Sequence, residues 1–293
     1  MKPGKAVCAL LAAGMFMLPA LAVPERAAAA QAVSQQETKL SPRLRKIAGI
    51  IKNAAPCHVY FSDLTQKGGL YRGNETMPSA SMIKVFILAL AYQDIADGTL
   101  SRNETFTLTR DNVVGGSGTL QNRAYGTRVP LKELLEKMII DSDNTATNIL
   151  IDRLGMENIN AYMQAHGYCS SVLRRKMMDL AALQAGRDNL TSVKDVGLLF
   201  KRLYNGTCVS PELDAEMLGI YDQQTDNDKI PARLPEGTVV AHKTGEVSDV
   251  RHDGGIVYTA NGDYVLVIFT SDYYPYDGIA ALSRKIYDAY TAE

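Results

Sequence analysis

Ser81 and Lys84 are separated by three positions at the start of an apolar segment that follows Pro78. On a helix this separation places both side chains on one face, one turn apart. A serine hydroxyl is a useful nucleophile only when a base takes its proton, and a lysine with a depressed pKa can be that base. The pair predicts nucleophilic catalysis, while a helix cap beside a solvated lysine is the alternative.

A second polar motif, Ser142-Asp143-Asn144, lies between two segments with a helical pattern. The Ser142 hydroxyl can relay a proton to a leaving group, and the Asn144 amide can hydrogen-bond a substrate amide or Lys84. Serine, aspartate and asparagine are also preferred at helix N-termini, so a plain helix start is the alternative interpretation.

The third motif, Lys243-Thr244-Gly245, ends a predicted strand from Thr238 to His242. Lysine and threonine at a strand edge can hold a substrate carboxylate, and glycine lets a substrate backbone approach closely. An exposed turn is the alternative. Each motif alone has little specificity, but together, each on the element type that the chemistry requires, they indicate one catalytic site.

The elements that position these motifs are predicted from hydrophobic periodicity and turn residues. Helical patterns dominate between Pro78 and Asp222, and strand patterns lie on both sides of that region. Asn261-Gly262 predicts a hairpin between the last two strands. The predicted helices are 41–54, 82–95, 131–140, 145–154, 193–204 and 279–290, and the predicted strands are 57–64, 238–242, 255–260 and 264–270.

These elements predict an α+β fold. It is an α/β sandwich in which an antiparallel sheet from both chain ends is flanked by helices, with a mainly helical lobe inserted. We predict a signal peptide over 1–30, a linker over 31–40 and a single catalytic domain over 41–293. Its sheet lobe comprises 41–77 and 223–293, and its helical lobe comprises 78–222.

The N-terminal segment has the pattern of an export signal. Lys2 and Lys5 precede an apolar run from Ala6 to Val23, and small residues follow up to Ala30. This order predicts a cleaved secretory signal peptide and a periplasmic or extracellular protein. An uncleaved membrane anchor is the alternative, although the run is short and is interrupted by Pro19.

Composition narrows the classes of partner. Lys and Arg number 31 and Asp and Glu 32, giving a net charge of −1, which lacks the basic footprint of nucleic-acid binders. The cysteines and histidines show no metal-ligand spacing, so we expect no metal and no cofactor. We expect a small-molecule substrate and a monomer. We expect His242, beside Lys243, to tune the pocket and the other histidines and cysteines to be structural. These other residues are Cys57, Cys169, Cys208, His58, His166 and His252.

The three motifs, in this order, resemble those of the class A β-lactamase branch of the penicillin-recognising serine hydrolases. The segment from Met138 to Asn148 and the pentapeptide Ala241-His242-Lys243-Thr244-Gly245 also match the wording of that family. The resemblance covers roughly residues 40–290. It implies a β-lactamase/transpeptidase-like fold with the site between the two lobes.

Site roles follow from this resemblance. It implies that Ser81 is the acylated nucleophile and Lys84 a general base. Backbone N–H groups of Ser81 and of the strand after Gly245 would form the oxyanion hole. The other implied roles are Ser142 as proton relay, Asn144 as a contact to substrate and lysine, Lys243, Thr244 and Gly245 as the substrate-carboxylate site, and Arg251 as added positive charge, with an Arg251–Asp253 surface pair as the alternative.

One family residue is missing from this chain. Class A enzymes carry a glutamate after the second motif that activates the deacylating water, and matching Arg175 to the family arginine places Met177 there. Methionine cannot accept a proton. Asp179, two residues further on, is the nearest carboxylate and a candidate substitute base; a salt bridge with Arg175 or Arg187 is the alternative.

Several functions therefore stay open at this point. The first expectation is a secreted β-lactamase-like serine hydrolase that acylates normally and deacylates slowly. A D-alanyl peptidase or other peptidoglycan amidohydrolase would use the same serine. A non-catalytic penicillin-binding or wall-binding module is a third possibility, which the intact Ser81, Lys84, Ser142 and Lys243 argue against.

Overall fold

The structure is a computed structural model that describes residues 40–292 except 55, 65–68 and 272–273. The predicted signal peptide lies outside the described residues, as does almost all of the predicted linker. Two units are distinguished, residues 1–45 and residues 46–293. The helix predicted over 41–54 is α2 (Pro42–Lys52), and the Ser41 hydroxyl caps it by accepting a hydrogen bond from the Leu44 N–H at 3.2 Å.

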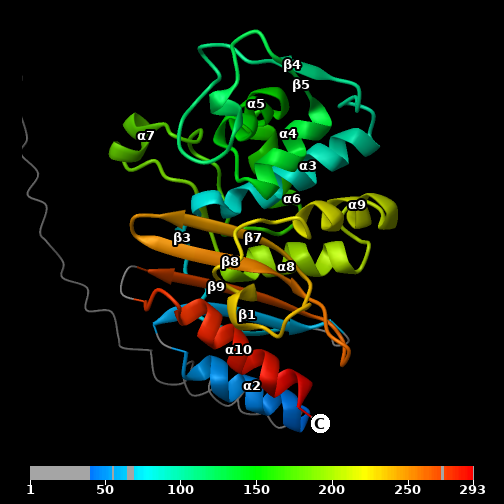
Figure 1. The fold of residues 1–293 in the computed structure, drawn as a ribbon, viewed down its shortest axis with the longest axis vertical. Coiled ribbons are helices and arrows are strands. Elements are labelled where there is room, and N and C mark those ends of the chain that lie inside the picture. Colours follow the sequence, from blue (N-terminus) through cyan, green and yellow to red (C-terminus); the bar gives the residue numbers. More distant parts are fainter. Residues whose placement is uncertain (1–39, 55, 65–68, 272–273, 293) are drawn as a thin grey trace, which may run out of the picture. The chain divides into compact units, whose positions relative to one another are not determined.

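A five-stranded antiparallel sheet lies at the centre of the second unit, in the order β2-β1-β9-β8-β7 (Figure 1). Early and late parts of the chain both contribute strands, which confirms the predicted sheet. Val59 pairs with Ile268 between β1 and β9, and Thr244 pairs with Asp253 between β7 and β8. The strands are β1 (Cys57–Asp63), β2 (Leu70–Arg72), β7 (Val240–Val247), β8 (Val250–Val257) and β9 (Tyr264–Ser271).

Two of the strands are longer than their sequence pattern predicts. Residues 240–242 of the predicted strand 238–242 belong to β7, which begins at Val240 and continues to Val247. The Lys243-Thr244-Gly245 motif therefore lies inside an edge strand rather than at its end. Only residues 255–257 of the predicted strand 255–260 belong to β8, which begins five residues earlier at Val250, and 258–260 lie beyond its end. Charged residues such as Glu246 and Arg251 interrupt the apolar pattern there, but they face each other across the two strands.

Helices cover both faces of the sheet. Helix α8 (Val193–Tyr204) contacts β1, β8 and β9, and a β-carbon at Gly197 would lie only 2.2 Å from the Tyr60 ring. Helix α10 (Gly278–Thr291) places the Tyr290 ring 5.9 Å from that of Phe61. Because Tyr60 and Phe61 are successive strand residues, the two helices lie on opposite faces.

The chain between β3 and α9 is largely helical (Figure 1). A continuous apolar core joins it to the sheet and includes Phe86, Leu150 and Val267. Within the described part of the chain, no helix is both long and apolar enough to span a membrane. The remaining elements are β3 (Met77–Pro78), η1 (Ala80–Ile83), α3 (Lys84–Ala96), β4 (Thr105–Thr107), η2 (Leu120–Asn122), β5 (Arg128–Pro130), α4 (Leu131–Ile140), α5 (Asn144–Leu154), α6 (Met156–Ala165), α7 (Leu180–Gln184), β6 (Leu190–Thr191), α9 (Pro211–Tyr221) and η3 (Pro231–Arg233).

Candidate active site

Ser81 lies on the 3-10 helix η1, directly before α3. The sequence pattern predicts one α-helix from Met82, but a 3-10 turn has three residues, so positions i and i+3 stack directly. Ser81 and Lys84 therefore lie on one face. Ala80, just before the serine, has a φ of 45°, a conformation that non-glycine residues adopt at an energetic cost.

Lys84 is fully buried and holds the second motif in place. Its ammonium donates to the Ser142 carbonyl at 2.7 Å, to the Ser142 hydroxyl at 3.1 Å and to Asn144 Oδ1 at 3.0 Å. These contacts join residues that are about sixty positions apart in sequence. The solvated-lysine alternative is wrong for Lys84.

Ser142 lies in the short connection between α4 and α5 with a φ of 54°, a second left-handed non-glycine residue at the site. The residue that caps α5 is Asp143, the next residue along the chain, because its carboxylate accepts the Ala146 N–H at 2.8 Å. The Ser142 hydroxyl is therefore not used as a cap. Its oxygen accepts hydrogen bonds from both Lys84 and Lys243, each at 3.1 Å, which leaves its own proton to be donated elsewhere.

Lys243 is also fully buried, and its ammonium donates to the Thr244 carbonyl at 2.8 Å as well as to Ser142. Burial lowers the pKa of Lys243 to about 7, against the opposing effect of the Asp226 and Asp253 carboxylates. Burial also lowers the pKa of Lys84 well below its ordinary value, and the charge of Lys243 lowers it further. A lowered pKa favours the neutral Lys84 amine, which can accept a proton.

Strand β7 passes close to the serine. A β-carbon added at Gly245 would lie 3.2 Å from the backbone nitrogens of Ser81 and Met82. Any larger residue at Gly245 would push the edge strand away from η1. The glycine of the third motif thus lets β7 and the serine approach closely.

Asn144 completes the group of side chains around Lys84. Its amide nitrogen donates to the Gly115 carbonyl at 3.1 Å while its oxygen accepts from Lys84, so the amide orientation is fixed at both ends. A β-carbon at Gly116, whose φ is 84°, would lie 2.6 Å from Asn144 Nδ2 and 3.0 Å from Met178 Sδ. Met178 therefore lies beside Asn144 next to the loop of Gly115 and Gly116.

Met177 occupies the segment where the family resemblance places a glutamate. Its N–H donates to Asn148 Oδ1 at 2.8 Å, and its carbonyl accepts from Asn148 Nδ2 at 3.0 Å. The side chain is buried in the apolar core. The backbone is thus fixed against α5 by an asparagine that the sequence reasoning did not single out.

Asp179 is used as a helix cap in the structure. Its carboxylate accepts the Ala182 N–H at 2.9 Å, and the residue is solvent-exposed at the start of α7. Lys84 donates to Ser142 and Asn144 rather than to Asp179, and Asn144 donates to the Gly115 carbonyl. The salt bridge suggested between Asp179 and Arg175 is wrong, because Arg175 pairs with Asp188 at 2.8 Å.

Arg251 lies on β8 near the third motif, and the alternative of a surface pair with Asp253 is wrong. Its guanidinium stacks on the Tyr276 ring at 3.5 Å, donates to the Tyr276 carbonyl at 2.7 Å and lies 3.4 Å from Glu246. Asp253, the predicted partner, is instead buried and bonded to His242 Nδ1 at 2.8 Å.

Sequence reasoning also missed the charged loop that precedes β7. Lys229 has only 1% of its side chain exposed and pairs with Asp226 at 2.9 Å, Asp228 at 2.6 Å and Glu246 at 3.2 Å. The loop and the end of β7 are thus joined by one buried ammonium. Nothing in the residue types around 226–229 signals this, because the local pattern is that of an exposed polar loop.

The histidines have structural contacts. His242 Nε2 lies 3.2 Å from Asn227 Oδ1, which links β7 to the loop of Asn227. His252 is buried, its Nε2 lies 2.9 Å from the Pro78 carbonyl, and burial lowers its pKa to about 4. The neutral His252 ring therefore donates to the segment that leads into Ser81. Within the described residues, no group of three or more His, Cys, Asp or Glu side chains could hold a metal ion.

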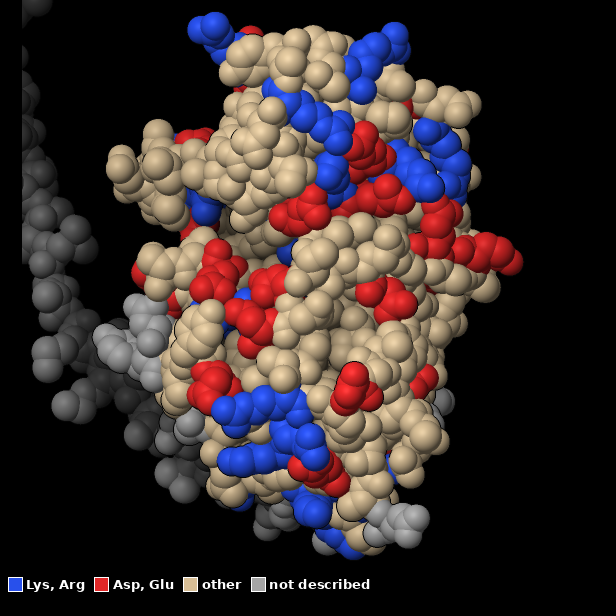
Figure 2. All heavy atoms as spheres, in the orientation of Figure 1, with Lys and Arg blue, Asp and Glu red and all other residues tan. Residues whose placement is uncertain are grey.

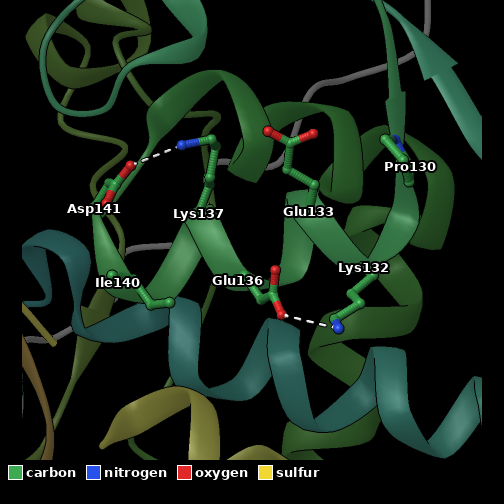
Figure 3. Close-up of a pocket in the computed structure, with 7 residues that line it drawn as sticks. All are labelled: Pro130, Lys132, Glu133, Glu136, Lys137, Ile140 and Asp141. Carbon is green, nitrogen blue, oxygen red and sulfur yellow. Dashed lines mark hydrogen bonds and ion pairs between the residues drawn. The ribbon is translucent and has the colours of Figure 1, made fainter. Parts of the chain in front are cut away.

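One surface pocket lies along the outer side of α4, next to the second motif (Figure 3). Its charged side chains are paired, Lys132 with Glu136 at 3.7 Å and Lys137 with Asp141 at 3.0 Å. Its lining residues include no serine, cysteine or histidine. The residues that line this pocket therefore include none of the serines and lysines of the three motifs.

The sequence is similar to those of known β-lactamases. The family model described as "Beta-lactamase enzyme family" matches residues 39–290. The extended-spectrum beta-lactamase PER-1 of Pseudomonas aeruginosa is 27% identical over 212 residues, which is 68% of each chain. A beta-lactamase of Bacteroides uniformis is 26% identical over 282 residues, which cover 87% of this chain and 93% of the relative.

Solved structures show the same fold. The structure of PBP-A superposes with a TM-score of 0.75 at 30% identity, covering 85% of this chain and 96% of that one. A point mutant of PBP-A, in an acyl-enzyme complex with penicillin G, matches equally well. The TLA-1 extended-spectrum beta-lactamase has a TM-score of 0.77 at 18% identity, covering 85% of this chain and 99% of that one, which shows the fold.

Proposed function

The chain belongs to the beta-lactamase enzyme family, and we propose that it acylates Ser81 with a β-lactam or a related amide and then deacylates slowly. The observation that carries the proposal is the buried Lys84, which has a lowered pKa and contacts both polar residues of the second motif. The candidate base Lys84 and the second lysine, Lys243, both donate to the candidate proton relay Ser142, and Lys84 follows Ser81 by three positions. This arrangement supports acyl transfer.

The proposed acylation moves two protons. Neutral Lys84 takes the Ser81 hydroxyl proton while the serine oxygen attacks the substrate carbonyl, and the carbonyl C–N bond then breaks. Ser142 gives its proton to the leaving nitrogen and takes one back from the protonated Lys84, whose Nζ lies 3.1 Å from its oxygen, while Lys243, bonded to the same oxygen, supports that transfer. The close approach of β7 at Gly245 supports an oxyanion hole between the Ser81 N–H and the strand after Gly245.

Slow deacylation follows from the residues near Asn148. Met177 has no acid–base group, and the Asp179 carboxylate is engaged as the cap of α7. General-base assistance to an attacking water contributes roughly 10²–10⁴ in rate. Without it, the acyl-enzyme should persist, and the protein should act mainly as a penicillin-binding acyltransferase.

A peptidoglycan amidohydrolase of the D-alanyl peptidase type is the second candidate. The likeness to PBP-A at 30% identity favours it, as does the methionine at the position of the water-activating glutamate. A wall peptide and a β-lactam both present an amide carbonyl to the same serine. A non-catalytic binding module is disfavoured, because simple binding does not require a buried lysine next to a serine.

Intact-mass spectrometry with penicillin G tests the acylation step. We expect the protein mass to rise by the mass of one penicillin and Ser81→Ala to show no increase. Ser101→Ala, at an exposed serine outside the site, is the matched control and should acylate like the wild type. An unmodified wild-type mass together with intact drug would contradict the proposal.

Export is proposed separately, on the N-terminal sequence pattern alone. We propose cleavage near Ala30 and release outside the cytoplasm. N-terminal sequencing of the protein purified from its native host tests this proposal. A retained Met1 would contradict it.

A further inference from the structure

His242 has a hydrogen-bond acceptor at each end of its ring. It lies on β7 directly before Lys243, and only 1% of its side chain is exposed. Its Nδ1 lies 2.8 Å from Asp253 Oδ1, and its Nε2 lies 3.2 Å from Asn227 Oδ1. A neutral imidazole donates from one nitrogen only, whereas an imidazolium donates from both. Two acceptors therefore favour the doubly protonated ring.

The Asn227 amide is held with its oxygen toward the His242 ring. Asn227 belongs to the bridging loop, residues 224–230, and its amide nitrogen lies 3.2 Å from the Gln224 carbonyl and 3.5 Å from the Thr225 carbonyl. If the amide were turned over, its oxygen would face two carbonyl oxygens, which can only accept. The oxygen therefore faces the ring, and Nε2 needs a proton to bond it.

Asp253 supplies the negative charge that a buried imidazolium needs. Its carboxylate is fully buried, Oδ1 faces His242, and Oδ2 accepts the Ile230 N–H at 2.8 Å. The proton between the two side chains stays on the ring, because imidazole is more basic than a carboxylate. The pair then has no net charge, which avoids the cost of burying a single ion.

The surrounding charges also favour a cation at His242. Figure 2 shows Asp and Glu side chains gathered around β7 and the loop before it. Two further elements contact β7: η1 has no charged side chain, and α9 has only acidic ones. Within β7, β8 and the bridging loop, four carboxylates face three cationic side chains, so a protonated His242 balances them. The carboxylates are Asp226, Asp228, Glu246 and Asp253, and the cationic side chains are Lys229, Lys243 and Arg251.

The bridging loop joins the second motif to the third. The side chains of Gln224 and Thr225 donate to the last two carbonyls of α4, at 2.9 and 3.2 Å, just before the segment of Ser142. The other end of the loop is held by the pair of His242 and its carboxylate on β8. The loop thus spans the same junction as the 3.1 Å bond from Lys243 to Ser142.

We propose that His242 is a positioning residue: its ring is an imidazolium that fixes the bridging loop and so aligns Lys243 with Ser142. This inference rests on the proposed acylation of Ser81 and adds a buried cation to the residues that support it. Because the ring is enclosed by protein, it acts through Lys243 rather than on the substrate.

The charge of the ring is measured by ¹⁵N NMR of the full chain, labelled in its histidines, near neutral pH. We expect both ring nitrogens of His242 to carry a proton. His252 is the internal control, because its Nδ1 accepts the Thr270 N–H at 3.4 Å, its Nε2 lies 2.9 Å from the Pro78 carbonyl, and burial lowers its pKa to about 4. It should show one ring proton. A single ring proton on His242 as well overturns the inference.

Asp253→Asn should switch the His242 ring to its neutral form. The new amide can accept the Ile230 N–H with its oxygen and donate to Nδ1 with its nitrogen, so only Nε2 keeps a proton. The same NMR measurement detects the loss of one ring proton. A ring that stays doubly protonated in this variant contradicts the proposed pairing.

The rate of acylation by penicillin G, followed by intact mass, tests the positioning role. His242→Gln keeps a donor for Asp253 but has no charge, and it should acylate about tenfold more slowly, as for loss of one hydrogen bond to a charged group. Asp253→Asn should act in the same direction. His166→Gln, at a half-buried histidine that ends α6, is the matched control and should acylate like the wild type. Wild-type rates in folded His242→Gln and Asp253→Asn overturn the inference.

The outcomes separate the two proposals. A single ring proton on His242 in a protein that still acylates overturns the inference and leaves the proposed function standing. A wild type that penicillin G does not acylate overturns the proposed function, and the role of His242 in acylation with it. If His242→Gln does not fold, the spectra of the wild type and of Asp253→Asn decide.

Discussion

At the scale of single residues, the proposed chemistry depends on two buried lysines that donate to one serine hydroxyl. Burial lowers the pKa of both Lys84 and Lys243, and the charge of Lys243 lowers that of Lys84 further. One can take a proton from Ser81 while the other supports Ser142. The sequence motifs identified these residues correctly as neighbours in space, but their burial and bond lengths came only from the structure.

Placing a carboxylate at Met177 should accelerate deacylation. In Met177→Glu the backbone stays fixed by Asn148, and a glutamate that turns toward the serine can activate water, a gain of roughly 10²–10⁴ in rate. The lifetime of the penicillin adduct by intact mass is the measurement. Met177→Gln, of similar size and without a base, is the control, and equal adduct lifetimes in the two variants would refute this role.

The charge of Lys243 should make the binding of anionic substrates pH-dependent. With a pKa of about 7, Lys243 is protonated at about pH 6 and mostly neutral at about pH 8. The affinity for penicillin before acylation should therefore fall as pH rises through about 7. Stopped-flow acylation that separates binding from the chemical step tests this. Lys243→Arg, which stays charged, should remove the dependence, and an unchanged profile would speak against it.

At the scale of elements, the sequence predicts most of the helices and the hairpin, but it predicts too early an end for the strand that carries the third motif. The predicted helices over 131–140 and 193–204 match α4 and α8, because their apolar periodicity is undisturbed. The sequence pattern predicts that the strand ends at His242, whereas β7 continues to Val247. Its Lys243 and Thr244 are polar but buried, so they interrupt the apolar alternation that marks a strand. Contacts such as Asn148 with Met177 join distant segments and leave no local signal.

The Asn148 side chain should contribute strongly to the order of the segment that carries Met177. Asn148→Ala leaves a backbone N–H and a carbonyl of Met177 without their partner, at a cost of about 1–3 kcal/mol. Denaturant unfolding measures the loss. Asn158→Ala, at an exposed asparagine with a single bond to the Leu154 carbonyl, is the control and should cost much less. Equal losses in the two variants would argue against a special role for Asn148.

At the scale of the whole molecule, one core joins the sheet to the helical region, and the buried His252 of β8 contacts the Pro78 carbonyl in the segment before Ser81. The architecture could be predicted from the sequence, because strand patterns lie at both ends of the chain and helical patterns lie between them. The two-lobe division at residues 77–78 and 222–223 stays a prediction. Helix α8, placed by that division in the helical lobe, contacts β1, β8 and β9.

Acid should destabilise the whole protein through His252. Its pKa is lowered from 6.5 to about 4, so below about pH 6.5 the unfolded state binds a proton that the folded state does not. Stability should fall as pH drops from about 6.5 to about 4 and then level off for this group, by about 3 kcal/mol in total. Unfolding of wild type and His252→Gln across this range measures the difference. An identical pH dependence in both would show that His252 is not the cause.

The lifetime of the acyl-enzyme tests the central claim most directly. Wild-type protein mixed with excess penicillin G is followed over minutes to hours by intact mass, while hydrolysed drug is measured in the same samples. The account predicts one stable adduct per chain, absent in Ser81→Ala, with little drug hydrolysed beyond one equivalent. Rapid accumulation of hydrolysed drug without a persistent adduct would contradict it and would mean that another group activates the deacylating water.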